Sequence, residues 1–279
     1  MKTFCIYFIL FTTFACADSF KDRILVYAGP GVSENCLKQT LRSVQHIVEP
    51  QFKVEPILPN QLIDESWDKT TALLIIPPGA DIPYTIALNG AGNKKITIFV
   101  QNGGAFLGIC AGSYYAGQFV DFARGTPLEV LGHRELAFFP GVVRGPVLAE
   151  YDYQTSSGAR AAKILWKDQT GFDANKTFTL YYNGGGYFVN AAEYKNTTVL
   201  AVYDDLQDYA AMIECNVGQG RAILSSVHIE CDPALLDKED PDLQLILPNL
   251  QDANAQRMEL LRHLIQRALT KGIDCTYPE

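Results

Sequence analysis

The chain has 279 residues, of which 48% are hydrophobic, so it is long enough to bury a full core. Its formal net charge is −8, and Lys and Arg are not clustered anywhere. This charge balance argues against nucleic acid and anionic membrane surfaces as partners. The sequence contains no C-x-x-C, H-x-H or H-E-x-x-H spacing. Neither a metal site nor a cofactor is therefore predicted.

The N-terminal residues 1–17 predict a signal peptide. The apolar run over residues 4–15 is too short to span a bilayer. An A-x-A cleavage site at residues 15–17 places the mature start near Asp18. We therefore expect a secreted or periplasmic protein, without stable membrane insertion after the signal is cleaved.

Strands and helices are predicted to alternate over the first half of the mature chain. Ser33 is placed to cap a helix that begins at Glu34. The run over 72–76 is apolar throughout, as in a strand covered by helices on both sheet faces. Strands are expected at 23–28, 52–58, 72–76 and 105–107, and helices at 34–48, 93–101 and 113–120. The alternation predicts an α/β fold with a doubly wound, mainly parallel sheet and helices on both faces.

The second half of the chain is predicted to add more strands. Residues 217–220 form a turn signal that is typical of a hairpin. An amphipathic helix is expected from about 252 to 271, with Gly272 as its stop. The expected strands cover 136–143, 161–166, 178–182, 186–190, 198–203, 210–216 and 221–227. Because no long linker divides the chain, residues 18–279 are predicted to form a single domain with a β-rich second half.

The segment Gly108-Ile109-Cys110-Ala111-Gly112 carries the strongest indication of chemistry. It lies between an expected strand and an expected helix, which is the arrangement of a nucleophile elbow. The flanking glycines allow a tight turn, and a helix N-terminus favours the reactive thiolate form of a cysteine. We predict that Cys110 is a nucleophile; the alternative is a small buried core residue.

A nucleophilic cysteine needs a base, and the chain has four histidines. His228 closes the apolar strand expected at 221–227 and is followed by Glu230. Residues two apart in an extended strand face the same side. We therefore predict that Cys110, His228 and Glu230 act as nucleophile, base and orienting acid. The remaining histidines are expected on helices or in a polar turn: His46, His263 and His133.

Two loops are predicted to complete the site. The first follows the strand at 72–76, where an α/β sheet presents its ligands. There the backbone N–H of Gly79 or Ala80 is placed to form an oxyanion hole with that of Ala111. The second is the glycine-rich run over 181–187, which either approaches a ligand or forms a flexible turn. The residues expected to bind substrate are Ala80, Asp81, Tyr84, Tyr114, Asn183, Gly184 and Gly185.

Five cysteines remain after the predicted signal peptide is removed: Cys36, Cys110, Cys215, Cys231 and Cys275. An odd number in an exported chain leaves at least one thiol unpaired, and Cys110 is the natural candidate. The other four are compatible with zero, one or two disulfides.

These motifs resemble those of a known superfamily. The Gly-Ile-Cys-Ala-Gly elbow with His-Ile-Glu is similar to the class I glutamine amidotransferase-like superfamily, which implies a flavodoxin-like fold. Residues 103–115 look like the N-terminal domain of eukaryotic-type biotin-protein ligases, and 135–141, 183–186 and 227–230 support this narrower match. The resemblance implies Cys110, His228 and Glu230 as a triad, with Gly79 and Ala111 at the oxyanion. Since neither Gly-Arg-Gly-Arg nor Lys-Trp-Pro-Asn-Asp occurs, biotin ligation is not expected.

Three functions are consistent with these motifs. The first is an exported thiol hydrolase or amidotransferase-like protein that acts on an amide, γ-glutamyl or peptide bond of a small-molecule or peptide substrate. The second is a non-catalytic module that binds a small ligand or regulates, and retains the triad. The third makes Cys110 a redox or acyl-carrying thiol. The sequence leaves the substrate and the oligomeric state open.

Overall fold

The computed structural model describes residues 21–270. The predicted signal peptide over 1–17, its cleavage site, Gly272 and Cys275 lie outside the described residues.

A 13-stranded sheet forms the centre of the described chain. Its strands are β1 Arg23–Tyr27, β2 Lys53–Ile57, β3 Thr71–Ile76, β4 Ala105–Ile109, β5 Gly117–Phe122, β6 Val130–His133, β7 Phe139–Gly145, β8 Arg160–Trp166, β9 Thr177–Tyr182, β10 Tyr187–Phe188, β11 Thr197–Tyr203, β12 Leu206–Val217 and β13 Gly220–Ser225. The α-helices are α1 Glu34–Val48, α2 Pro59–Asp64, α3 Asp81–Leu88, α4 Ala91–Gln101, α5 Ala111–Tyr115, α6 Pro241–Gln244, α7 Leu247–Asp252 and α8 Asn254–Leu269. Short 3-10 helices occupy Trp67–Lys69, Ala191–Glu193 and Pro233–Leu235.

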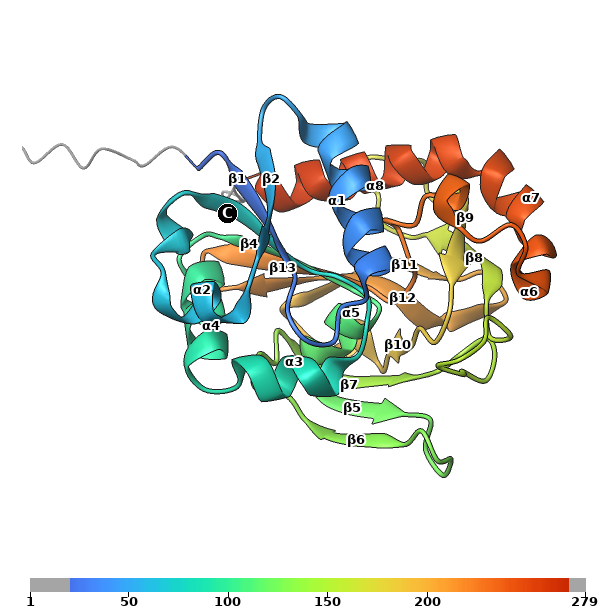
Figure 1. The fold of residues 1–279 in the computed structure, drawn as a ribbon, viewed down its shortest axis with the longest axis horizontal. Helices are drawn as coiled ribbons and strands as arrows, with labels where there is room; N and C mark the ends of the chain where they lie inside the picture. The colour runs from blue at the N-terminus through green and yellow to red at the C-terminus, as the bar shows by residue number, and fades with distance from the viewer. Residues whose placement is uncertain (1–20, 271–279) are drawn as a thin grey trace, which may run out of the picture.

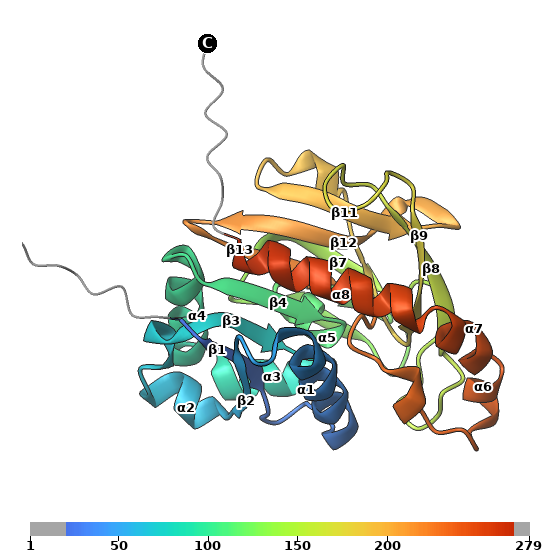
Figure 2. The same cartoon turned by 90° about the horizontal axis from the view of Figure 1, so that it is seen from above.

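The sheet has a parallel part and a largely antiparallel part (Figure 1). Strands β2, β1, β3, β4 and β13 run parallel to one another in that order. Strand β13 also pairs antiparallel with β12, from which the sheet continues through β10, β7, β5 and β6. Strands β11, β8 and β9 extend it from the other side of β12 (Figure 2). The predicted doubly wound α/β fold with a β-rich second half is confirmed, and its parallel pairing is concentrated in the first half and β13.

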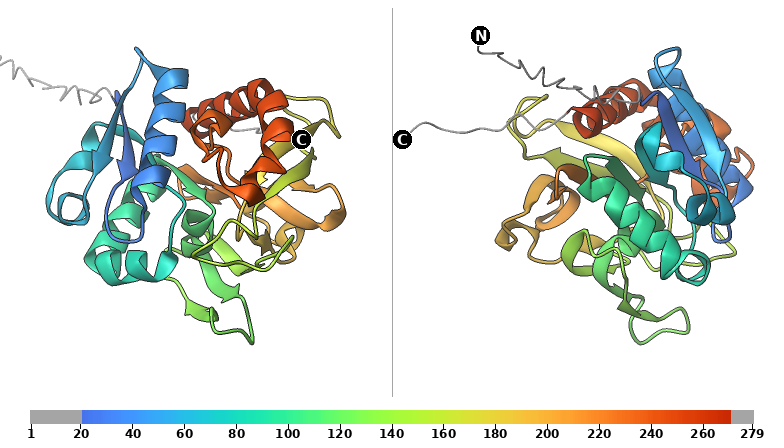
Figure 3. Two further views of the ribbon diagram at one scale, coloured as in Figure 1. Left: turned by 45° about the vertical axis from the view of Figure 1, so that its right-hand side comes forward. Right: turned by 90° about the vertical axis from the view of Figure 1, so that its left-hand side faces the viewer.

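Helices cover both faces of the parallel strands. Helices α1 and α8 lie side by side over one face, where Val44 and Leu261 join the same buried core (Figure 3). Helices α2, α3 and α4 cover the other face and bury Leu62, Leu88 and Ile96. Helix α1 begins and ends where the sequence predicts. Its start is capped by Ser33, whose hydroxyl accepts the Cys36 N–H at 3.1 Å.

The segment after the elbow differs from the prediction. The helix expected over 113–120 ends at Tyr115, and residues from Gly117 onwards form strand β5 instead. Gly117 allows this change, because a Cβ there would lie 2.5 Å from the Val143 side chain of β7. Strand β5 then pairs parallel with β7 and antiparallel with β6, so tertiary pairing overrides the local helical pattern.

Other differences concern strand and helix ends. The strand expected over 136–143 begins only at Phe139, because Ala137 has a left-handed backbone with φ of 44°. Helices α2 and α3 and strand β6 were not predicted. They are short, and the alternation of apolar and polar residues is weak in them.

Gly112 is the position at which the elbow packs most tightly against the sheet. A Cβ there would lie 2.1 Å from the carbonyl oxygen of Ile76, a backbone atom at the end of β3. We expect Gly112→Ala to destabilise the protein by several kcal/mol or to prevent folding, since backbone cannot move aside. Thermal unfolding measures the effect.

Gly92 provides the matched control. It lies within α4, and a Cβ there would meet only side chains of Leu88 and Ile63, at 3.1 Å or more. Gly92→Ala is expected to fold normally, because alanine favours a helix by about 1 kcal/mol over glycine. Equal melting temperatures for the two variants would contradict the tight packing at Gly112.

Candidate active site

The predicted site residues meet at the carboxyl ends of three adjacent parallel strands. Gly79 follows β3, Cys110 follows β4 directly and His228 follows β13. All three line one cavity of about 400 Å³, a size suited to a small ligand. The fold therefore brings together residues that the chain separates by more than a hundred positions.

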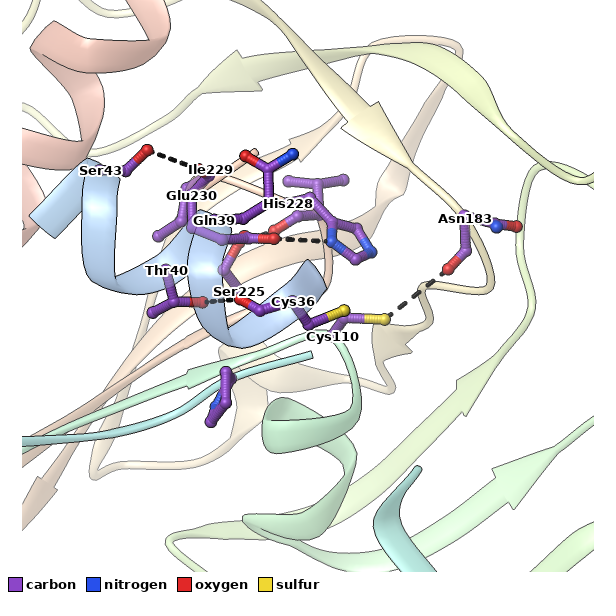
Figure 4. Close-up of polar contacts among 12 residues, drawn as sticks. Cys36, Gln39, Thr40, Ser43, Cys110, Asn183, Ser225, His228, Ile229 and Glu230 are labelled. Carbon is purple, nitrogen blue, oxygen red and sulfur yellow. Dashed lines mark hydrogen bonds and ion pairs between the residues drawn. The ribbon is translucent and has the colours of Figure 1, made fainter. Parts of the chain in front are cut away.

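The backbone at Cys110 has the strained conformation of a nucleophile elbow. Its φ and ψ are 48° and −106°, a region that costs a non-glycine residue about 1–3 kcal/mol. The Cys110 N–H donates to the carbonyl of Ser225 at 2.8 Å, which ties the turn to β13. Its sulfur lies 3.7 Å from the carbonyl oxygen of Asn183 (Figure 4). The following helix α5 has five residues, so Cys110 sits at the start of a shorter helix than predicted.

His228 and Glu230 form the predicted pair. Their Nδ1 and Oε1 atoms are 2.9 Å apart, and both side chains are buried (Figure 4). The pair does not arise from alternation along β13, because β13 ends at Ser225 and the next residues bend on either side of an isolated antiparallel bridge between His228 and Tyr181. The His228 N–H instead donates to the carbonyl of Tyr181 at 2.9 Å. Among the described residues, no protein atom hydrogen-bonds to the buried Nε2 of His228, which leaves it available to a reacting group.

The electrostatics of His228 favour its charged form. Burial lowers the pKa of the ring, but the charges of Glu230 and Cys110 outweigh burial and hold that pKa well above 6.5. A ring that holds its proton at neutral pH is suited to stabilise a neighbouring thiolate and to donate that proton to a leaving group.

The backbone around Glu230 is anchored by buried polar contacts from two helices. Ser43 of α1 donates to the Glu230 carbonyl at 2.6 Å. Arg257 of α8 is also buried and donates to the Ile229 carbonyl at 2.9 Å. These contacts fix the bent segment that carries the acid–base pair, so helices on one face of the sheet position the site.

The turn after β3 carries the residues predicted for the oxyanion hole. The N–H of Ala80 is already used, since it donates to the carbonyl of Gly31 at 2.9 Å. This leaves Gly79 as the candidate donor, together with Ala111 beside the nucleophile. Residue 79 must be glycine, because a Cβ there would lie 2.0 Å from the Gly31 carbonyl oxygen.

Five of the seven residues expected to bind substrate line the cavity: Ala80, Asp81, Tyr114, Asn183 and Gly184. Tyr84 does not line it, because its buried hydroxyl donates to the Pro77 carbonyl at 3.1 Å below the turn. Gly185 does not line it either. Its role is close packing, since a Cβ there would lie 2.1 Å from the Ser226 carbonyl oxygen.

An aromatic wall was not predicted. We use this name for Phe122, Tyr151 and Tyr153, whose rings pack edge to face in sequence and line the cavity. The two tyrosines lie in the irregular segment between β7 and β8, where no periodic pattern marks them as site residues. Tyr181 belongs to the glycine-rich run over 181–187, but the sequence predicted no role for this residue. Its ring centroid lies 5.1 Å from that of His228.

The charges that line the cavity are acidic and paired. Asp81 contacts Arg134 at 2.7 Å, and Glu230 contacts His228. No lysine or arginine is among the cavity-lining residues of the described chain. The cavity therefore offers no free cation to a ligand carboxylate.

Comparisons with known proteins identify the family. The model of the biotin-protein ligase N-terminal domain matches residues 22–275. The chain belongs to this family. It is 37% identical over 231 residues to the biotin–protein ligase of Schizosaccharomyces pombe, covering 80% of this chain but only 36% of the ligase. It is also 36% identical over 257 residues to an uncharacterized protein of Chlamydia muridarum, covering 91% of this chain and 97% of that protein.

Solved structures show the same fold at low identity. A glutamine amidotransferase from Thermotoga maritima matches with a TM-score of 0.58 and 13% identity, over 90% of this chain and 99% of its own. A second glutamine amidotransferase matches with a TM-score of 0.51 and 17% identity, over 82% of this chain and 98% of its own. The predicted resemblance to the biotin-protein ligase N-terminal domain, with a class I glutamine amidotransferase-like fold, is confirmed.

Residues 21–270 contain neither a metal-binding cluster nor a membrane-spanning helix. Within this range, no group of three or more His, Cys, Asp or Glu side chains is arranged to hold a metal ion. None of the helices in the same range combines the length and hydropathy needed to cross a membrane. The cysteines that this range contains are free thiols: Cys36, Cys110, Cys215 and Cys231.

Replacing the orienting acid tests the electrostatics of His228. In Glu230→Gln the chief charge that raises the His228 pKa is lost, while burial still lowers it. We expect the wild-type ring to stay protonated well above pH 6.5 and the variant ring to lose its proton at a markedly lower pH. Imidazole nuclear magnetic resonance shifts across pH measure both. An unchanged titration in the variant would contradict the coupling.

Proposed function

We propose that this protein is a thiol-dependent hydrolase that cleaves an amide or a related acyl bond. One observation carries the proposal: Cys110 projects at a strained elbow into the cavity that holds the unpartnered Nε2 of His228, whose Nδ1 contacts Glu230. A nucleophile, a base and an orienting acid in one cavity are the parts that acyl transfer requires.

The first half of the reaction forms an acyl-enzyme. His228 already holds the proton that ionises the Cys110 thiol, so the sulfur attacks the carbonyl carbon of the substrate as a thiolate. The oxyanion that develops is stabilised by the backbone N–H groups of Gly79 and Ala111. When the C–N bond breaks, His228 donates that proton to the leaving amine, and the acyl group stays on the sulfur as a thioester.

The second half releases the acyl group. His228 takes a proton from water, and the resulting hydroxide attacks the thioester carbonyl. The C–S bond then breaks, the carboxylic acid leaves, and the Cys110 thiolate is restored beside the protonated ring of His228. Glu230 keeps the ring oriented throughout.

The cavity favours an acyl group that is aromatic or apolar and carries no free carboxylate. Its aromatic wall offers ring faces and edges for packing. Its acids are paired, and none of its described lining residues is a lysine or arginine. Within the class of small-molecule and peptide substrates, this chemistry supports neutral amides over γ-glutamyl compounds with a free carboxylate.

A second candidate function is a non-catalytic ligand-binding module. The match to 36% of the S. pombe ligase favours it, because in that protein a similar segment is joined to a longer chain. In this case a small ligand would occupy the cavity while Cys110 stays unmodified, and this chain would not itself ligate biotin.

Acylation of Cys110 distinguishes the two candidates. Incubation with a panel of amides and activated esters is expected to add the mass of one acyl group at Cys110. In His228→Ala the rate of this addition should fall by about 100-fold or more, because general base catalysis is lost. Intact-mass spectrometry over time measures both rates.

His46→Ala is the matched control, since His46 is an exposed residue of α1. It should acylate at the wild-type rate. Acylation that is equally fast in the two histidine variants, or no acylation by any reagent while a ligand still binds, would favour the non-catalytic module.

We also propose that the protein is exported. The A-x-A site at residues 15–17 supports cleavage before Asp18. Expression of the full chain in a host with a secretory pathway should give a protein outside the cytoplasm whose N-terminal residue is Asp18. Mass spectrometry of the N-terminal peptide tests this, and a cytoplasmic protein that retains residues 1–17 would contradict it.

A further inference from the structure

Three thiols line the cavity, although the proposed function uses only one. Cys36, Cys110 and Cys231 are all lining residues, and all are free thiols. The other two are therefore reactive groups beside a nucleophile, with no part in the acyl-transfer steps.

Cys36 is the thiol that faces Cys110. It lies in the first turn of α1, where its N–H bonds to the Ser33 hydroxyl. Figure 4 shows the Cys36 sulfur directed from the helix at the Cys110 side chain, whose own sulfur is turned toward Asn183. Burial chiefly raises the pKa of the Cys36 thiol, and the charges of His228, Glu230 and Cys110 also act on that pKa. Cys36 thus belongs to the same electrostatic cluster as the nucleophile.

Cys231 is less suited to react with Cys110. It is more buried than Cys36, with 4% of its surface exposed. Burial raises the pKa of Cys231, and the strongest charges acting on that pKa come from Glu230, Arg257 and Cys36. Cys36 therefore interacts with both other thiols, whereas Cys110 is not among the strongest influences on Cys231.

We propose that Cys36 and Cys110 form a reversible disulfide when a peroxide oxidises the nucleophile. Hydrogen peroxide, as a two-electron oxidant, converts the Cys110 thiolate to a sulfenic acid and releases hydroxide. The Cys36 thiol attacks that sulfur, so that the S–S bond forms and water leaves. A reducing dithiol returns two electrons and restores both thiols. The disulfide blocks further, irreversible oxidation of Cys110 to a sulfinic acid.

The first turn of α1 is able to supply the movement that bond formation needs. A disulfide holds its sulfurs about 2.05 Å apart. Residues 33–35 are exposed and Leu37 is only partly buried, whereas the fully buried residues of α1 begin at Gln39. A shift of the first turn toward the elbow therefore leaves those fully buried residues in place.

Peptide mapping after oxidation tests the proposal. The reduced full-length protein is treated with at least two equivalents of hydrogen peroxide, its free thiols are capped with N-ethylmaleimide, and it is digested. We expect a cross-linked peptide that joins Cys36 to Cys110, an intact mass lower by about 2 Da before capping, and full reversal by dithiothreitol. In Cys36→Ala and Cys36→Ser, Cys110 should instead gain the mass of two oxygen atoms.

Cys231→Ala and Cys215→Ala are the matched controls, and both should keep the Cys36–Cys110 link. Circular dichroism checks that each variant is folded. The proposal is overturned if wild-type Cys110 becomes sulfinic acid while Cys36 stays free, or if the link joins Cys231 to either thiol. An effect of oxidation on acylation can be observed only if the proposed hydrolase function holds. The disulfide between Cys36 and Cys110 is detected by peptide mass and does not depend on that function. A protein that forms the link but acylates with nothing would refute only the hydrolase.

Discussion

The left-handed backbone at Cys110 depends on contacts that hold it from both sides. Its N–H is bonded to β13, and Gly112 packs against the end of β3 at a distance that admits no side chain. The strain of this turn is supported by the two strands that also lead to His228 and to the turn at Gly79. The same contacts therefore fix where Cys110 lies relative to His228 and Gly79.

Much of this arrangement was predictable from the sequence. Continuous apolar runs bounded by glycine and proline marked β1, β3 and β4, and Ser33 marked the start of α1. The contact between His228 and Glu230 was predicted from the alternation of side chains along a strand. In the structure the strand has already ended, and hydrogen bonds from Ser43 and Arg257 to the backbone hold the segment in place instead. Spacing of two residues was thus informative even though the strand had already ended.

What escaped prediction depends on packing between distant segments. The short helix α5 gives way to β5 because β7 is available to pair with it, which no local pattern reports. Tyr84 and Gly185 follow site motifs in sequence but support the cavity from outside. Tyr151 and Tyr153 reach the cavity from an irregular segment. Cys36 reaches it because the first turn of α1 lies at the cavity. Only the assembled chain reveals these neighbours.

Strand β13 has a different kind of neighbour on each side, being parallel to β4 and antiparallel to β12. It therefore forms the seam between the half that carries Gly79 and Cys110 and the half that carries the irregular segment with Tyr151 and Tyr153. The hydrogen bonds given for the elbow go to other parts of the chain. A change in the length or sequence of that segment would therefore reshape the cavity wall while those bonds stay in place.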